Sequence, residues 1–189
     1  MFNHRPNSLN AGSLWGRPFY ILREAWNILN AIAEGKIESG DEKKLNALKG
    51  ETMAVIALCQ FDLTRCFGYP YTKDNGASLG APLIDHLVGT YENPSRSTVA
   101  QAYDFIIETL EEAVTLMSEE KNNGRMNKYA ARALLARVYL YHNDNRKAFD
   151  MAEQLIKDVD ASGSYALYPH EKYVAAWSVE TKFGSESFF

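Results

Sequence analysis

The chain has 189 residues, of which 46% are hydrophobic and 23% are charged. This length and composition can bury a hydrophobic core, which excludes a disordered protein and predicts one domain. The net charge of −4 comes without a block of Lys or Arg, so nucleic acid is not an expected partner. No stretch approaches the roughly 20 apolar residues that a membrane-spanning helix needs.

The hydrophobic pattern predicts two helices in the first third of the chain. Apolar residues recur every three or four positions over 13–34, and Gly35 can end that helix in the left-handed conformation. A polar stretch over 36–44 separates it from a second helix over 45–67. Residues 53–59 are apolar on every side of this helix, so we expect it to lie in the centre of the core.

Cys59 and Cys66 both fall in the second predicted helix. Seven residues along a helix separate their Cα atoms by roughly 10 Å, which is too far for a disulfide bond between them. We expect both to be small buried hydrophobic side chains, so they do not report the redox compartment.

The segment 68–95 has a different character from the helices around it. It contains four glycines, three prolines and several aromatic residues, and it shows no helical period. This composition predicts a long surface loop, with at most a short turn or extended piece. Long loops inside a compact domain are often functional.

A third helix follows the loop and has a clear start. It begins at Ser97 or Thr98, and Thr98 and Gln101 have the spacing of a capping box, in which each side chain binds the other residue's backbone N–H group. Apolar residues then recur at helical spacing as far as Met117, which predicts an amphipathic helix.

The fourth and fifth predicted helices form an antiparallel hairpin. They span 128–141, with Asn127 as the N-cap, and 146–159, and a short turn joins them. The tail over 165–189 is aromatic and irregular, with at most a short helix over 172–178. The residues expected to face inward in the fifth helix are Ala148, Met151, Ala152, Leu155, Ile156 and Val159.

This hairpin also matches one unit of the tetratricopeptide pattern. In that pattern a Leu, a small residue and an aromatic residue on the first helix are followed nine residues later by an Ala on the second. Leu135, Ala136, Tyr139 and Ala148 stand at those offsets, while Arg132 replaces the usual Trp. An ordinary helical hairpin with Ala at its close contact is the alternative interpretation.

Four segments, taken in order, resemble the SusD/RagB family of Bacteroidetes. They are 19–37, 48–71, 95–114 and 124–156, and the second of them ends in an aromatic turn, Phe67–Pro70. The resemblance implies an all-α fold of tetratricopeptide-like hairpins, with about five main helices and one long loop. Departures from the family pattern include a shorter aromatic turn.

The resemblance also implies that residues 1–189 are a fragment of a longer protein. Helical scaffold is expected over 13–67 and 97–160, and the long loop over 68–95. The family's chain begins with a lipidated cysteine and continues into a second, loop-rich region. The apolar end of this chain, with Trp177, Phe188 and Phe189, supports the expectation of further packed structure.

The function implied by the resemblance is non-catalytic glycan binding at the surface of the outer membrane. Family members are lipoproteins that pair with a SusC-like TonB-dependent transporter and hold an oligosaccharide or polysaccharide over its mouth. The membrane would be reached only through a lipid anchor, which is missing from this chain.

The residues themselves favour neither a catalytic nor a metal site. The four histidines lie in predicted loops and turns without metal-ligand spacing, and no catalytic motif or nucleotide-binding fingerprint is present. Carboxylate pairs such as Glu111–Glu112 and Glu119–Glu120 are better explained as solvated charges. No cofactor and no metal are therefore expected. A small helical hydrolase and a tetratricopeptide-like protein-interaction scaffold stay open as alternatives.

Carbohydrate binding needs aromatic faces that pack on sugar rings, with amides or charged groups nearby to bind hydroxyl groups. Most of the aromatic residues fall in helices, where packing is the simpler explanation. The candidate ligand-binding residues lie outside the regular periods: Trp15, Tyr69, Tyr71 and Asn75.

Overall fold

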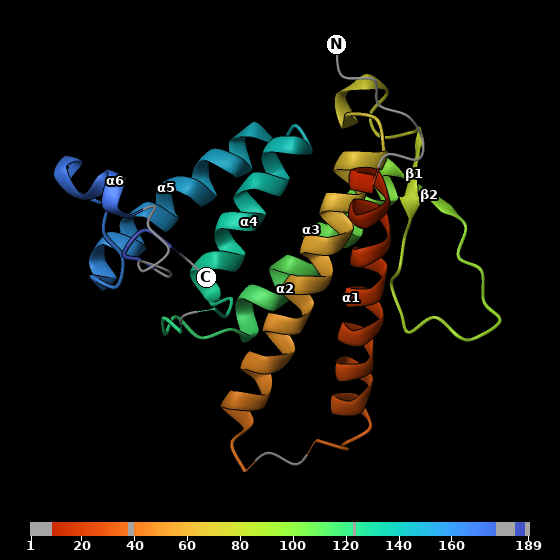
Figure 1. Ribbon diagram of the computed structural model, residues 1–189, viewed down its shortest axis with the longest axis horizontal. Helices are drawn as coiled ribbons and strands as arrows, with labels where there is room; N and C mark the ends of the chain where they lie inside the picture. Colours follow the sequence, from red (N-terminus) through yellow and green to blue (C-terminus); the bar gives the residue numbers. More distant parts are fainter. Residues whose placement is uncertain (1–8, 38–39, 123, 177–183, 188–189) are drawn as a thin grey trace.

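The computed structural model describes residues 9–37, 40–122, 124–176 and 184–187, and Figure 1 shows their arrangement. The elements in chain order are α1 (Leu9–Ala33), α2 (Glu42–Phe67), η1 (Tyr71–Lys73), β1 (Leu79–Pro82), β2 (Arg96–Thr98), α3 (Val99–Leu116), α4 (Lys128–Tyr141), α5 (Asn145–Ser162), η2 (His170–Lys172) and α6 (Tyr173–Ala176). Here η1 and η2 are single turns of 3₁₀-helix.

The five long helices pack in the order in which they occur in the chain. α1 packs on α2, α2 on α3, α3 on α4 and α4 on α5. Figure 1 shows α1 beside α2, with the α4–α5 pair on the side of α2 that faces away from α1. Consecutive packing of helix pairs is the arrangement of helical solenoids. The predicted all-α fold with about five main helices is confirmed.

α2 lies at the centre of the core, as predicted. Its fully buried side chains include Ile56, Phe61 and Leu63, and it packs on both α1 and α3. The two cysteines of this helix differ, however: Cys59 is buried, whereas Cys66 is exposed. The prediction that both are buried is therefore wrong for Cys66, because the last turn of α2 reaches the surface.

Two helices begin earlier than predicted, and a cap explains one of these differences. α2 begins at Glu42 instead of residue 45, because the Asp41 carboxylate accepts hydrogen bonds from the backbone N–H groups of Lys43 (3.0 Å) and Lys44 (3.3 Å). α1 begins at Leu9 instead of residue 13 and contains Pro18. Part of the predicted polar linker thus forms the first turn of α2.

Other helix ends follow the predicted cap chemistry. Thr98 and Gln101 form the capping box of α3. The backbone N–H group of Gln101 donates to the Thr98 hydroxyl oxygen (3.1 Å), and the backbone N–H group of Thr98 donates to the Gln101 side-chain oxygen (2.9 Å). Asn127 caps α4 by accepting from the backbone N–H group of Ala130 at 3.0 Å. Gly163 ends α5 in the left-handed conformation, with φ of 63°.

α5 packs with one side only. Ala148 and Leu155 are buried against the hairpin partner, but Ile156, which was expected to face inward, is 61% exposed, and Phe149 is also exposed. The expectation for Ile156 is wrong because α5 is the last long helix of the stack and has a neighbour on one side.

The tail is anchored by one buried tyrosine. Tyr165 packs edge-on against Tyr129, with ring centroids 6.0 Å apart, and the Asn127 side-chain amide donates to its hydroxyl oxygen at 2.7 Å. Of the predicted short helix over 172–178, the part up to residue 176 is described, and it consists of the end of η2 and the single turn of α6. Trp177, Phe188 and Phe189 lie outside the described residues, as does His4.

The segment 68–95 is more regular than a simple loop. After η1 it forms strand β1, which pairs antiparallel with β2, with Leu79 opposite Thr98 and Pro82 opposite Arg96. The Arg96 guanidinium donates to the carbonyl oxygens of Gly80 (2.7 Å) and Leu79 (2.9 Å). Because β2 occupies residues 96–98, α3 begins at Val99.

Three side-chain hydrogen bonds tie this segment to the helices. Gln60 of α2 is fully buried; its amide nitrogen donates to the Pro82 carbonyl (3.1 Å), and its amide oxygen accepts from the Ile84 backbone N–H group (3.3 Å). The Trp26 indole of α1 donates to the Ile84 carbonyl at 3.1 Å. The backbone of Ile84 is thus satisfied by two different helices. We call Trp26, Gln60, Pro82 and Ile84 the loop anchor.

Replacing Gln60 tests the loop anchor. Gln60→Leu replaces the amide by an apolar side chain of similar volume. It leaves the buried Ile84 N–H and Pro82 carbonyl groups without partners, so we expect a loss of about 2–4 kcal/mol of unfolding free energy. Urea denaturation measures this loss of unfolding free energy. The control Gln154→Leu, on the exposed side of α5, is expected to change stability by less than about 0.5 kcal/mol. Equal stability of Gln60→Leu and the unchanged chain would contradict this role.

The two cysteines give a second test. Burial raises the pKa of the Cys59 thiol to about 11, so at pH 8 it is protonated and covered, whereas Cys66 is exposed. An aromatic disulfide reagent at pH 8 should therefore modify one thiol per folded chain quickly and the second only on unfolding. Cys66→Ser should abolish the fast phase, and a fast phase that survives this substitution would show that Cys59 is open to solvent.

Candidate ligand-binding surface

The candidate residues fall on α1 and on the turn that follows α2. Trp15 lies in the second turn of α1, while Tyr69, Tyr71 and Asn75 lie between Phe67 and the start of β1. The loop anchor and the pairing of β1 with β2 hold the far end of this turn segment. The site is therefore built on two neighbouring helices and one anchored segment.

Trp15 is half-exposed, and part of its ring serves packing. Its centroid lies 5.1 Å from that of Phe19 and 4.8 Å from that of Phe67, both in edge-to-face geometry. This arrangement fixes the indole orientation and joins α1 to the end of α2. With 40% of the residue exposed, an indole surface stays available to a ligand.

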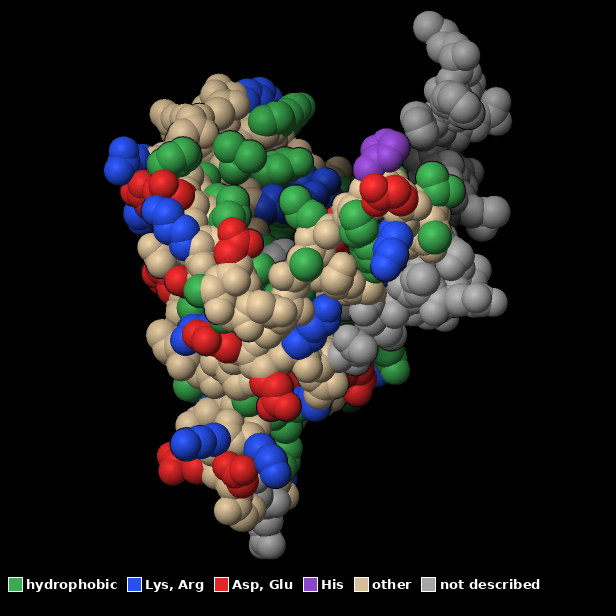
Figure 2. Space-filling view, turned by 90° about the vertical axis from the view of Figure 1, so that its left-hand side faces the viewer, with side chains coloured by type: hydrophobic (Ala, Val, Ile, Leu, Met, Phe, Trp, Pro, Cys, Tyr) green, Lys and Arg blue, Asp and Glu red, His purple; other side chains and the backbone are tan. Residues whose placement is uncertain are grey.

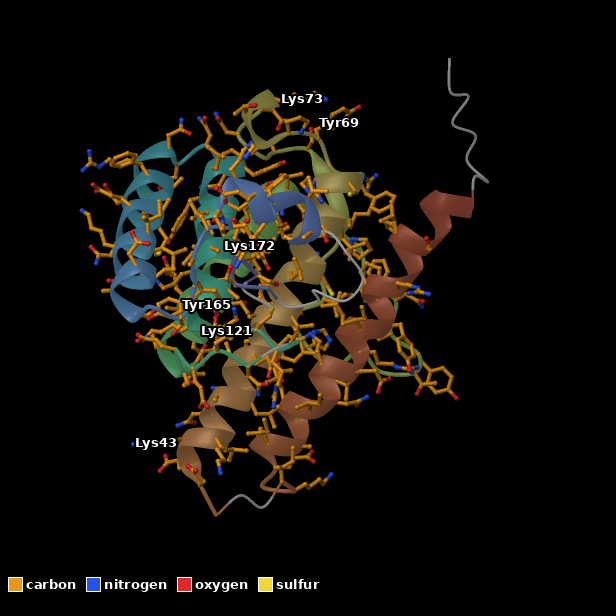
Figure 3. The ribbon with its side chains drawn as sticks, turned by 60° about the vertical axis from the view of Figure 1, so that its left-hand side comes forward. Lys43, Tyr69, Lys73, Lys121, Tyr165 and Lys172 are labelled. Atoms are coloured by element: carbon orange, nitrogen blue, oxygen red, sulfur yellow. The ribbon has the colours of Figure 1, made fainter. Side chains whose placement is uncertain are left out.

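Tyr69 is the most open of the three candidate aromatic residues, with 57% of its surface exposed. The Lys73 ammonium nitrogen lies 3.1 Å from its ring centroid, and Figure 3 shows the two residues together at the upper end of the molecule. A cation at this position is attracted to the electron-rich ring face. The contact holds Tyr69 in place and adds a cation beside it.

Tyr71 is placed as a packing residue. Its ring centroid lies 4.3 Å from that of His142 and 5.7 Å from that of Tyr103. Gly76 covers it so closely that a Cβ atom at that position would lie 2.7 Å from the Tyr71 ring. Tyr71 therefore joins η1 to α3 and α4, and it does not share the exposed surface of Tyr69.

Asn75 shapes the turn. It is exposed and has a φ of 55°, and Gly76 follows with a φ of 76°, so two successive residues are left-handed. The Gly76 N–H group donates to the Tyr71 carbonyl (3.0 Å), and the Gly76 carbonyl accepts from Ala100 (2.9 Å). The exposed position of Asn75 allows its amide to meet a polar ligand.

The structure thus divides the four candidates. Trp15 and Tyr69 present aromatic surface to solvent, Asn75 presents an amide, and Tyr71 supports the turn from inside. Sequence reasoning missed Lys73 and Gln60. The Tyr69–Lys73 spacing of four residues and the single amide in the apolar run of α2 were the available signals.

The residues that match the tetratricopeptide pattern lie on α4 and at the start of α5. Leu135, Tyr139 and Ala148 are buried and Ala136 is partly buried, as the close approach of α4 and α5 requires. The Tyr139 hydroxyl donates to the Glu111 carboxylate at 2.5 Å. Burial and this carboxylate raise the pKa of Tyr139.

Three of the four carboxylates considered for catalysis have partners in the structure. Glu111 accepts from Tyr139, Glu112 pairs with Lys49 (2.9 Å) and Glu119 pairs with Lys128 (3.6 Å). Within residues 9–37, 40–122, 124–176 and 184–187, no group of three His, Cys, Asp or Glu side chains is arranged to hold a metal ion. None of the described helices is long and apolar enough to cross a membrane.

Comparison with known proteins identifies the family of this chain. A family model for SusD-like proteins, described as starch-binding and associating with the outer membrane, matches residues 4–140. The chain belongs to the SusD-like family. A comparison with curated proteins found no match.

Solved structures agree with this assignment. A SusD superfamily protein from Bacteroides vulgatus ATCC 8482 is 95% identical over 100% of this chain, with a TM-score of 0.95, and the match covers 43% of that protein. One from Bacteroides thetaiotaomicron VPI-5482 is 40% identical, with a TM-score of 0.86, over 93% of this chain and 37% of that one. The SusD-like chain thus spans less than half the length of these relatives.

A more distant structure shares the fold. Surface glycan-binding protein A from Bacteroides uniformis is 19% identical, with a TM-score of 0.76, over 97% of this chain and 38% of that one. At this identity the likeness shows the fold alone.

The two tyrosines of the turn should respond differently to truncation. Tyr71→Ala removes a ring packed on Tyr103 and His142, so we expect a loss of about 2–3 kcal/mol of unfolding free energy. Tyr69→Ala, at the surface, should change it by less than about 1 kcal/mol. Urea denaturation of both variants measures the difference, and similar losses would show that Tyr69 is also a packing residue.

Proposed function

We propose that this SusD-like chain belongs to a non-catalytic glycan-capture protein at the surface of the bacterial outer membrane. The observation that carries the proposal is the family match over residues 4–140, since that family is described as starch-binding and associating with the outer membrane. The protein would hold an oligosaccharide or polysaccharide and deliver it to a SusC-like TonB-dependent transporter.

The geometry supports capture by stacking. Trp15 and Tyr69 offer rigid aromatic surfaces on which the apolar face of a sugar ring can pack, and Asn75 and Lys73 offer groups that bind hydroxyl oxygens. Stacking needs no proton transfer and no nucleophile. A binding function of this kind also agrees with the ion pairs and the hydrogen bond in which Glu111, Glu112 and Glu119 take part.

Delivery would be a non-covalent step. A lipid anchor outside this chain would hold the protein at the membrane, and closure over the transporter mouth would pass the oligosaccharide inward. The helical scaffold would then serve as the rigid part that carries the loops and contacts the transporter.

A protein-interaction scaffold is the second candidate function. It is favoured by the α4–α5 hairpin, in which Leu135, Tyr139 and Ala148 are buried. A shallow cavity of about 350 Å³ beside Tyr139, lined also by Lys147 and Met151, could receive a peptide side chain. The two functions differ in ligand class, so glycan binding decides between them.

Aromatic substitutions in the complete protein test the capture function. Trp15→Ala and Tyr69→Ala should each weaken the affinity for a polysaccharide that the protein binds by about three- to tenfold, which corresponds to the loss of one stacking contact. Affinity electrophoresis against a polysaccharide panel, followed by calorimetry, measures this change. Tyr91→Ala is the matched control, because Tyr91 is 96% exposed and lies between β1 and β2.

Two outcomes would count against the capture function. Failure of the complete protein to bind any polysaccharide in the panel would overturn it and favour the interaction scaffold. Binding that responds equally to Tyr91→Ala and to the two test variants would show that Trp15 and Tyr69 are not the contact surface.

A further inference from the structure

One histidine in the segment between β1 and β2 lies between two carboxylates. The Nδ1 atom of His86 is 2.6 Å from Asp85 Oδ1, and its Nε2 atom is 2.8 Å from Glu92 Oε1. Both are hydrogen-bond distances, and they involve the two different nitrogens of one imidazole ring. The ring therefore bridges two acidic side chains from the two ends of the 85–92 turn.

One protonation state of the ring makes both hydrogen bonds. An ionised carboxylate accepts hydrogen bonds and donates none, so each ring nitrogen must carry a proton to bind one. Neutral imidazole has a single N–H group, whereas imidazolium has two. The geometry thus requires a protonated His86, and loss of one proton breaks one of the two bonds.

Glu92 joins this bridge to the backbone of the turn. Its second carboxylate oxygen accepts from the Gly89 N–H group at 3.1 Å, and its own N–H group donates to the Gly89 carbonyl at 3.1 Å. Residues 85–92 lie outside the helices and strands, so contacts of this kind hold the turn. We call Asp85, His86, Gly89 and Glu92 the histidine clamp.

The turn forms one wall of a cavity against α1. Gly89 and Thr90 line this space of about 490 Å³ together with Phe19 and Arg23 of α1. The loop anchor fixes the segment at Ile84, and the histidine clamp holds the residues that follow. The state of the clamp therefore affects how firmly this wall of the cavity is held.

The groups around the clamp favour the protonated ring. The hydrogen bond to Asp85, and then that to Glu92, raise the pKa of His86 above its ordinary value of 6.5. The Gly89 N–H group, and then His86, lower the pKa of Glu92 below its ordinary value of 4.5. Among the described residues, the charged side chain that α1 contributes to the cavity is Arg23, which pairs with Glu24 at 2.9 Å.

These two shifts set the pH range in which the clamp is complete. The raised pKa of His86 stabilises the folded turn fully below pH 6.5, and this contribution is lost as the pH rises through the raised pKa. The lowered pKa of Glu92 contributes above pH 4.5 and is lost as the pH falls through the lowered pKa. The clamp is therefore complete between pH 4.5 and 6.5.

Ion pairs of Lys and Arg do not respond in this way. Acidic and basic side chains lie interspersed on the face in Figure 2, and α5 carries the pairs Arg146–Asp150 (2.9 Å) and Lys157–Glu153 (3.1 Å). Lys and Arg keep their charge to about pH 10 and above. A histidine between two carboxylates, by contrast, changes its charge near neutral pH.

We propose that His86 is a pH-dependent clamp that holds the 85–92 turn beside the cavity and releases it when the ring loses its proton. The cavity wall is then held firmly in mildly acidic solution and less firmly in mildly alkaline solution. The inference goes beyond glycan binding and does not depend on it, because it concerns the order of this segment.

Hydrogen exchange and histidine titration in the complete protein test the clamp. After correction for the intrinsic pH dependence of exchange, the amide groups of residues 87–92 should exchange about two- to fivefold faster at pH 9 than at pH 6. The effect is small because the clamp is half-exposed. NMR titration of isotope-labelled histidine should place the midpoint of His86 above 6.5.

Three variants assign the response to the clamp. His86→Gln should exchange at the faster rate at both pH values, because its one amide nitrogen does not replace two N–H groups on opposite sides of a ring. Glu92→Gln should lower the midpoint of His86, since it removes one of the two carboxylates. His170→Gln is the matched control, because His170 is exposed in η2 and lies outside the clamp, and it should keep the pH response.

Three results would overturn the inference. Equal corrected exchange at pH 6 and pH 9 in the unchanged protein would show that the ring does not hold the turn. A pH response that persists in His86→Gln would assign it to another group. A midpoint of His86 that Glu92→Gln leaves in place would show that this carboxylate does not bind the ring. Each result is independent of whether the complete protein binds a glycan.

Discussion

The arrangement of this domain depends on how the segment between α2 and α3 is held. One buried glutamine side chain, Gln60, satisfies the backbone of Pro82 and Ile84, and Trp26 satisfies the remaining carbonyl of Ile84 from a second helix. An irregular segment against an apolar core would otherwise leave peptide groups without partners, at a cost of about 1–3 kcal/mol each. The loop anchor removes that cost and fixes the position of Pro82 and Ile84, after which the chain runs back to α3.

The same constraint gives the candidate surface its rigidity. The turn after α2 is held at one side by Tyr71, packed between Gly76, Tyr103 and His142, and at the other by the β1–β2 pair. Tyr69 and Lys73 then project from a fixed base, and Trp15 meets the end of α2 through Phe67. A ligand that stacks on such side chains pays little ordering entropy, which is what a capture protein needs.

Cations packed on aromatic rings recur in the structure. Lys73 lies on Tyr69, and Arg65 and Arg137 lie around Phe61 and Tyr141. In the first case the ring is the proposed ligand surface and the cation is its neighbour. In the second the two rings fix the positions of the guanidinium groups of α2 and α4.

The sequence by itself determined the helices, most of their caps and the family. Periodicity and cap residues are local properties, so α4 with its Asn127 cap and the capping box of α3 could be predicted from spacing alone. Tertiary structure decided which of two similar residues faces solvent: Cys66 but not Cys59, and Tyr69 but not Tyr71. It also brought Arg65 beside Arg137, seventy-two positions later in the chain. Such choices depend on which distant helix covers a side chain, and spacing along the sequence carries no record of that contact.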